Sequence, residues 1–153
     1  MKVIDILNNT DKAVFSFELV PPLKGGDINK IYEAIEPLIA LAPPFINITF
    51  HRDEVVYREY PDGTIKKVTV TKRPGSVALA AAIMRRYNVD MVPHIVCGGA
   101  TRHKIENELI DLNFLDIENV MALRGDPIPG ERFFTPEEGG HQYSCDLVEQ
   151  ITR

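Results

Sequence analysis

The sequence lacks several features that assign a chain to a functional class at once. It has no basic run, and 17 Lys and Arg against 22 Asp and Glu give a formal net charge of −5, which does not favour nucleic-acid binding. No apolar stretch approaches the roughly 20 residues of a membrane-spanning helix. The apolar part of residues 1–10 is also too short for a signal peptide. We therefore expect a cytoplasmic protein that binds neither nucleic acid nor a membrane.

Motifs for metals, disulfides and dinucleotides are equally scarce. Cys97 and Cys145 are the only cysteines and have no CxxC spacing, so structural thiols in a reducing compartment are expected. The four histidines have no metal-ligand spacing, and no metal site is expected. A GxGxxG or P-loop motif is absent, so any dinucleotide must bind without the glycine-rich phosphate-binding loop of the Rossmann fold.

What the 153 residues do contain is a repeated alternation of strand-like and helix-like segments. Four apolar segments are expected to be strands, at 13–20, 45–50, 91–96 and 119–123. Helical patterns begin after Asp27, near Ser76, after Thr101 and near Ser144, and Pro37 is expected to kink or break the first of them. This alternation predicts βαβ units around a parallel sheet.

An atypical segment, 51–75, interrupts the rhythm after the second strand. Residues 55–60 and 64–70 are β-prone, and Pro61-Asp62-Gly63 is expected to join them as a hairpin. The expected pairs around the turn, Arg58 with Lys66 and Glu59 with Ile65, mix polar and apolar side chains on both faces. A central barrel strand is apolar on both faces, so this hairpin is predicted to project from the domain.

Polar side chains gather near the carboxyl ends of the expected strands. Alternation along each strand places bulky apolar groups, such as Phe15, Phe17, Ile46 and Ile48, on the helix-covered face. The opposite face is expected to collect Glu18, Asn47, Thr49, His94 and Arg124, with Asp126 just beyond the last strand. Polar groups inside a core are costly unless they are satisfied, and β/α barrels build active sites at this end. We interpret the set as a candidate site.

Simpler interpretations remain open for each of these residues. Glu18 is also compatible with a surface carboxylate at a strand end, and His94 with a hydrogen-bonded core histidine. Arg124 and Asp126 could form a structural ion pair. Arg124-Gly125-Asp126 also matches an adhesion tripeptide, but the acidic, cysteine-poor composition of the chain argues against that function.

Four motifs in order resemble those of the methylenetetrahydrofolate reductase family. They are the run from Phe15 to Val20 closed by Pro21-Pro22, Pro93-His94, the run Ala122-Leu123-Arg124-Gly125-Asp126, and Tyr143-Ser144-Cys145-Asp146-Leu147-Val148. The resemblance implies a parallel (β/α)8 barrel of the TIM type, in which residues 1–153 form the N-terminal half with about the first four βα units.

The resemblance also implies an activity and roles for individual residues. FAD is expected to be held by Thr49, His94, Arg124, Asp126, Tyr143 and Ser144. NAD(P)H reduces the flavin, which then reduces 5,10-methylenetetrahydrofolate to 5-methyltetrahydrofolate in one-carbon and methionine metabolism. The implied catalytic residues are Glu18, as the general acid that opens the folate ring, and Asp126, which stabilises the resulting cation.

Two departures from the family pattern limit this transfer. A glycine-rich run usually follows the second strand, whereas here Thr49-Phe50 leads into His51-Arg52-Asp53-Glu54. The chain also ends at Arg153, before the later strands of a barrel that typically takes about 250 residues. We expect residues 1–153 to be inactive alone and to self-associate as a homo-oligomer. The alternatives are a non-catalytic half-barrel module and another barrel enzyme with a phosphorylated substrate.

Overall fold

The computed structural model describes residues 1–128 and 130–153. The elements follow one another as α1 (Val3–Asn8), β1 (Phe17–Leu19), α2 (Ile28–Ile39), β2 (Phe45–Ile48), β3 (Glu54–Glu59), β4 (Ile65–Val70), α3 (Ser76–Tyr87), β5 (Asp90–Val96), α4 (Arg102–Phe114), β6 (Met121–Leu123) and α5 (Ser144–Thr152). The expected alternation of strands and helices is confirmed, with one short N-terminal helix, α1, that was not predicted.

The main sheet contains four parallel strands in the order β1-β2-β5-β6. Its register places Glu18 beside Asn47 and Asn47 beside Val92, while His94 lies beside Met121. Within the main sheet, each strand pairs with the strand that follows it in sequence once the β3–β4 hairpin is left aside. Successive units of a β/α barrel are arranged in this way. Among the described residues the sheet is open, with β1 and β6 as its edges.

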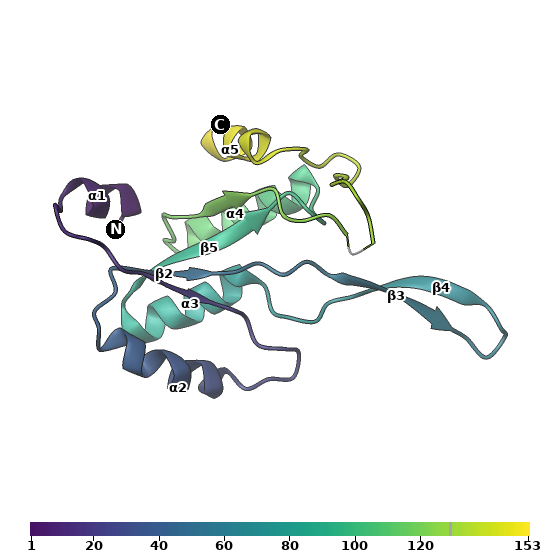
Figure 1. The fold of residues 1–153 in the computed structure, drawn as a ribbon, viewed down its shortest axis with the longest axis horizontal. Helices are drawn as coiled ribbons and strands as arrows, with labels where there is room; N and C mark the ends of the chain where they lie inside the picture. The colour runs from purple at the N-terminus through teal and green to yellow at the C-terminus, as the bar shows by residue number, and fades with distance from the viewer. Residues whose placement is uncertain (129) are drawn as a thin grey trace.

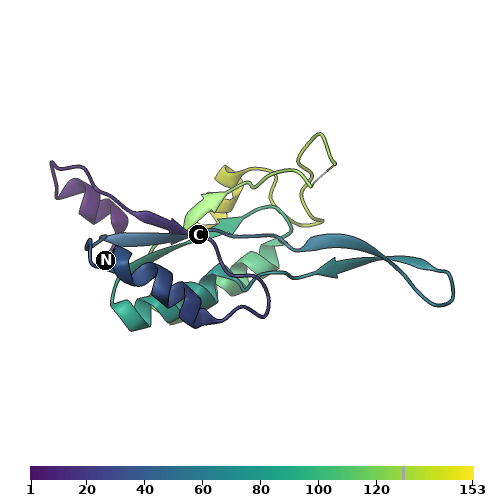
Figure 2. The same ribbon diagram turned by 60° about the horizontal axis from the view of Figure 1, so that its bottom comes forward.

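One face of this sheet carries the hydrophobic core. Four strand residues, Ile46, Ile48, Met91 and Ile95, are at most 1% exposed and pack against side chains of α2 to α5. The helices contribute Ile35, Leu79, Ile83, Ile105, Leu112 and Leu147. In Figures 1 and 2, α2 and α3 lie along the same side of the sheet. The opposite face is not covered by these helices, and it bears Glu18, Asn47 and His94.

Local sequence signals account for where the helices begin and end. The Asp27 carboxylate accepts the Asn29 N–H and the Thr101 hydroxyl accepts the Lys104 N–H, as expected of N-caps. Asn88 ends α3 in the left-handed conformation, with φ of 50°. A kink or a break was expected at Pro37, and the break is wrong, because α2 continues through this residue to Ile39. The kink stays a prediction.

The hairpin of β3 and β4 forms a separate two-stranded sheet. Its register pairs Arg58 with Lys66 and Glu59 with Ile65, as predicted from the sequence. Gly63 occupies the turn with φ of +78°, a conformation that glycine adopts without strain. Both views show the ribbon extending well beyond the rest of the domain. The prediction that it projects is therefore confirmed.

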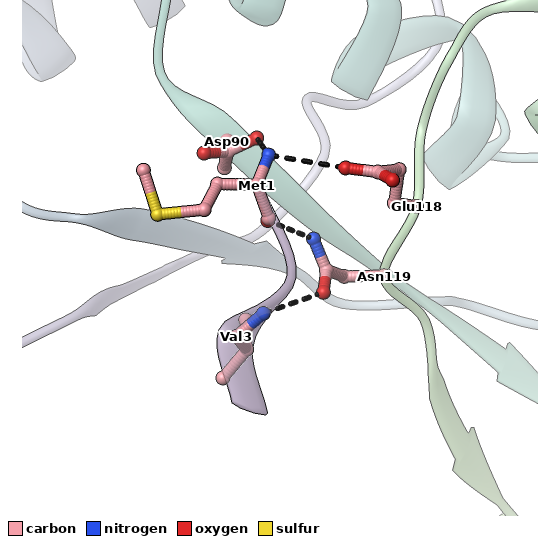
Figure 3. A network of polar contacts seen from close by, with 5 residues as sticks. All are labelled: Met1, Val3, Asp90, Glu118 and Asn119. Carbon is pink, nitrogen blue, oxygen red and sulfur yellow. Dashed lines mark hydrogen bonds and ion pairs between the residues drawn. The ribbon is translucent and has the colours of Figure 1, made fainter. Parts of the chain in front are cut away.

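The N-terminal segment is fastened to the end of the sheet where β5 and β6 begin (Figure 3). The Met1 amino group lies 2.6 Å from the Asp90 carboxylate and 3.2 Å from that of Glu118. The Asn119 amide donates to the Met1 carbonyl at 2.9 Å and accepts the Val3 N–H at 2.8 Å. This network lies at the amino ends of the strands, so it leaves their carboxyl ends free.

The strands at both edges are shorter than expected. Only Phe17–Leu19 of the segment 13–20, and Met121–Leu123 of 119–123, form ladders. Phe15, expected to face the helices, lies outside β1 and is 76% exposed. A strand with only one neighbour pairs on one side, so an apolar run at an edge overstates the length of its ladder.

Candidate functional site

A pocket of about 740 Å³ opens at the carboxyl ends of the strands, and we call it the mouth pocket. It is lined by Glu18, Thr49, Phe50, His51, Arg52, Asp53, Glu54, Val55, His94, Val96, Gly98, Leu123, Gly125, Asp126, Pro127 and Ile128. Four of the sequence-predicted site residues, Glu18, Thr49, His94 and Asp126, are brought together there. Its volume lies within the range of small-molecule and cofactor sites.

Glu18 and His94 form the polar centre of this pocket. Glu18 lies on β1 with its side chain 58% exposed, whereas the side chain of His94 on β5 is only 6% exposed. Their nearest atoms, Glu18 Oε2 and His94 Nε2, are 3.8 Å apart. Burial lowers the pKa of His94, and the negative charge of Glu18 opposes this by raising it. His94 is therefore neutral at physiological pH, beside a carboxyl group that solvent or a ligand can reach.

His94 also has an unsatisfied polar atom. Its backbone carbonyl accepts the Ser76 hydroxyl at 3.1 Å, but its buried Nε2 has no hydrogen-bond partner among the described residues. Buried ring nitrogens are normally paired, so this atom is suited to a ligand group or a bound water molecule. The interpretation of His94 as a fully satisfied core histidine is not supported.

Thr49 reaches the pocket directly after β2. Its hydroxyl donates to the Leu19 carbonyl at 3.3 Å and lies 3.1 Å from Nε2 of His51. Burial and the positive charge of Arg73 lower the pKa of His51. Thr49 and His51 thus form a second polar pair on the wall of the mouth pocket, in addition to Glu18 and His94.

The prediction that Arg124 shares a face with Glu18 and His94 is wrong. His94 lies beside Met121, and Val96 beside Leu123, so Met121 and Leu123 occupy that face. The alternate position, Ala122, packs against the core. The sequence-based assignment of the β6 residues to the two faces is wrong. All three strand residues are apolar, so the sequence does not show which of them faces the core.

The guanidinium of Arg124 lies 5.3 Å from the ring centroid of Phe134, outside the lining of the mouth pocket. It forms no ion pair with Asp126 among the residues that the structure describes. The structural alternative of an Arg124–Asp126 pair is therefore not supported. Asp126 itself is exposed and lines the pocket.

Tyr143 and Ser144 lie at the start of α5 and are not part of the pocket lining. Tyr143 is 54% exposed, and its carbonyl is 3.5 Å from the buried thiol of Cys97, just past the end of β5. Burial raises the pKa of Cys97, as expected of a structural thiol. The backbone at Tyr143 is thus anchored near the carboxyl ends of the strands, while its ring faces solvent.

The base of the hairpin contributes site residues that the sequence did not reveal. Five consecutive residues, His51 to Val55, line the mouth pocket. The sequence showed only that a charged insertion follows Thr49, and its position directly after a strand end was the available signal. Because parallel strands end at the same edge, any insertion at such a point begins beside the site.

Comparison with known proteins shows the family to which the chain belongs. The family model described as methylenetetrahydrofolate reductase matches residues 2–153. This chain belongs to the methylenetetrahydrofolate reductase family. It is 28% identical over 154 residues to "Methylenetetrahydrofolate reductase (NADH) 1" of Arabidopsis thaliana, covering 99% of the chain and 23% of that protein. It is 25% identical over 138 residues to "5,10-methylenetetrahydrofolate reductase" of Pectobacterium carotovorum, covering 89% of the chain and 38% of that protein.

The chain therefore spans about a quarter of the plant relative and under two fifths of the bacterial one. The α/β fold with a parallel sheet is consistent with the β/α architecture implied by the sequence motifs. Over the part of the chain that the structure describes, no helix has the length and apolar character needed to span a membrane.

Proposed function

We propose that this chain supplies the FAD-binding, proton-donating part of a methylenetetrahydrofolate reductase. In the proposed reaction, NAD(P)H is the reductant and 5,10-methylenetetrahydrofolate is converted to 5-methyltetrahydrofolate, within cytoplasmic one-carbon and methionine metabolism. Family membership supports the reaction class. The observation that carries the proposal is the pairing of Glu18 with the buried, unsatisfied His94 inside the mouth pocket.

The residues of the pocket fit a flavin. Val96, Leu123 and Ile128 supply apolar walls suited to a planar ring system, and the unpaired Nε2 of His94 offers a polar contact. Thr49 adds a hydroxyl near the pocket edge. When bound, FAD supplies the redox chemistry, accepting a hydride from NAD(P)H and donating one to the folate. We also propose FAD contacts from Arg124, Tyr143 and Ser144, none of which belongs to the pocket lining.

The chain's own residues perform the proton chemistry and the positioning. Glu18 is accessible on the pocket side of β1, so its carboxyl group can donate a proton to a folate nitrogen and open the five-membered ring. A neutral His94 beside it places no positive charge next to this carboxyl group. Asp126, on the other side of the pocket, provides a negative charge for the cation that ring opening produces.

Flavin binding tests the proposal directly. The full-length protein should purify with a flavin absorption spectrum, and apoprotein should bind FAD in a fluorescence titration. His94→Gln should weaken FAD binding by about tenfold, the value of one hydrogen bond in a buried site. The matched control is His103→Gln, which changes an exposed histidine of α4. Absence of flavin binding by the unmodified protein would favour the alternative of a non-catalytic half-barrel module.

A further inference from the structure

The charged run at the base of the hairpin brings an arginine to the mouth pocket. Arg52 follows β2, and its side chain extends to the loop after β5. A Cβ atom added to Gly98 would lie 3.6 Å from Nη1 of Arg52, and one added to Gly99 would lie 3.7 Å from its Nε and Nη2. The guanidinium therefore lies against two consecutive glycines and beside the ring of Phe134, whose Cε2 would be 3.4 Å from the same Gly98 Cβ atom.

The hydrogen-bonding capacity of Arg52 is largely unused. Its one ion pair within the described residues joins Nη2 to Oε1 of Glu137 at 3.6 Å, beyond hydrogen-bond distance, and its side chain is 25% exposed. A guanidinium carries five N–H donors in a planar fork that matches a phosphate group. Three-quarters buried and without a close acceptor, this fork is available to an anionic ligand.

The charges of the pocket show where an anion can bind. Glu18, Asp53 and Asp126 are acidic, as is Glu54, which is paired with Lys72 at 2.5 Å. Arg52 is the only lysine or arginine among the described lining residues. An anionic group of a ligand is repelled from most of the pocket and attracted to this one position. His51 and His94 do not provide a second positive charge for an anion. Burial is the main cause that lowers the pKa of each, and this favours the neutral ring.

We propose that Arg52 is a phosphate-binding residue of the mouth pocket, which exchanges its long contact with Glu137 for the pyrophosphate of a dinucleotide. The proposal deepens the proposed function, on which it rests, by assigning the anionic part of the ligand to the base of the hairpin. FAD and NAD(P)H both carry this pyrophosphate. The run His51-Arg52-Asp53-Glu54 contains no glycine, so its backbone is not suited to bind a phosphate closely. In the proposal, the side chain of Arg52 makes this contact instead.

The test compares ligands with and without phosphate on the full-length apoprotein. FAD and riboflavin are titrated by fluorescence, and NADH and inorganic pyrophosphate by calorimetry. Arg52→Gln should weaken FAD or NADH, and also pyrophosphate, by about 10- to 100-fold, the value of charge-assisted hydrogen bonds, and should leave riboflavin within about twofold. Whether the loss falls on FAD or on NADH identifies the source of the pyrophosphate. Arg52→Lys should retain part of the affinity.

Glu137 provides the matched control. Glu137→Gln should leave FAD affinity unchanged or raise it, because it removes the carboxylate that competes for Arg52. The double variant Arg52→Gln, Glu137→Gln leaves no unpaired charge and shows whether loss of the pair alone alters the fold. An equal loss of riboflavin and FAD in Arg52→Gln, or pyrophosphate binding that does not change, overturns the proposal. A protein that binds pyrophosphate through Arg52 but no flavin instead refutes the proposed function alone.

Discussion

Nε2 of His94 lies 3.8 Å from Oε2 of Glu18, although the two residues are on strands separated by β2. The register explains this proximity. Glu18 lies beside Asn47 and Asn47 beside Val92, so His94 is two residues farther along β5, on the same face. Asn47, on the strand between them, is 8% exposed, and its side-chain amide donates to the Ser16 hydroxyl at 3.4 Å.

Glu18→Gln in the full-length protein should separate the two half-reactions. Reduction of the flavin by NAD(P)H needs no proton on the folate and should be retained. Reduction of the folate should slow by about 10²–10⁴-fold, the usual contribution of a general acid. Stopped-flow absorbance of each half-reaction measures this, with Glu59→Gln on the exposed hairpin as control. Equal loss in both half-reactions would exclude Glu18 as the acid.

His94 should titrate below the ordinary histidine value of 6.5. Burial disfavours its cation, and Glu18 partly offsets this, so replacing Glu18 by Gln should lower the pKa of His94 further. Histidine ring resonances followed by NMR against pH report this directly. A pKa of His94 that rises in Glu18→Gln would show that the two side chains do not interact as the structure places them.

The same shift links His94 to stability. The folded state keeps His94 neutral at pH values where the unfolded chain is already protonated, so the unfolded state binds more protons and stability rises with pH. Its contribution is complete above about pH 6.5 and is lost as the pH falls toward the lowered pKa of the folded state. In urea unfolding at pH 7.5 and 5.5, His94→Gln should lose less stability on acidification than the unmodified protein does, whereas His103→Gln should not differ from it.

Local patterns in the sequence predicted the parts of the fold that depend on local interactions. The caps at Asp27 and Thr101 and the pairing of Arg58 with Lys66 need only neighbouring residues or a short turn, and all three are present. The ends of β1 and β6 depend on a neighbour on one side only, and the sequence predicted them too long. The break expected at Pro37 did not occur, and α2 ends two residues later, at Ile39.

The candidate site was predicted where polar and apolar residues alternate. Glu18 and His94 interrupt apolar strands, so their common face could be inferred from spacing. Along β6, Met121, Ala122 and Leu123 are all apolar, and alternation cannot show which of them faces the core. Arg124 was misplaced for this reason. Arg52 was not singled out because its proposed role depends on its proximity to Gly98, which is distant in sequence.

Shortening the hairpin should leave the domain folded. Replacing residues 57–67 by Asn-Gly joins Val56 to Val68, which already lie opposite each other, through a two-residue turn of the favoured type. Among the described residues, the removed segment forms no ladder with the main sheet, so the free energy of unfolding should change by less than about 1 kcal/mol. Lys24 N–H bonded to the Lys72 carbonyl still holds the base of the ribbon. Thermal and urea unfolding measure this, and a large loss would mean that the ribbon contributes to the core.

The polypeptide 1–153 should self-associate through the open side of its sheet. The Leu123 carbonyl accepts the Cys97 N–H at 3.0 Å, so the backbone groups of Ala122 point away from β5 and are available to another strand. Met121, on the same edge strand, is 39% exposed on the uncovered face. Burial of a methionine side chain contributes about 1.5–3 kcal/mol, so Met121→Lys should weaken association by at least about tenfold. Sedimentation velocity measures this, and Ile110→Lys, which places the same charge on the 60% exposed Ile110 of α4, should leave association unchanged. A polypeptide that sediments as a monomer at every concentration, or that responds equally to both substitutions, would show that the edge of β6 is not the surface of contact.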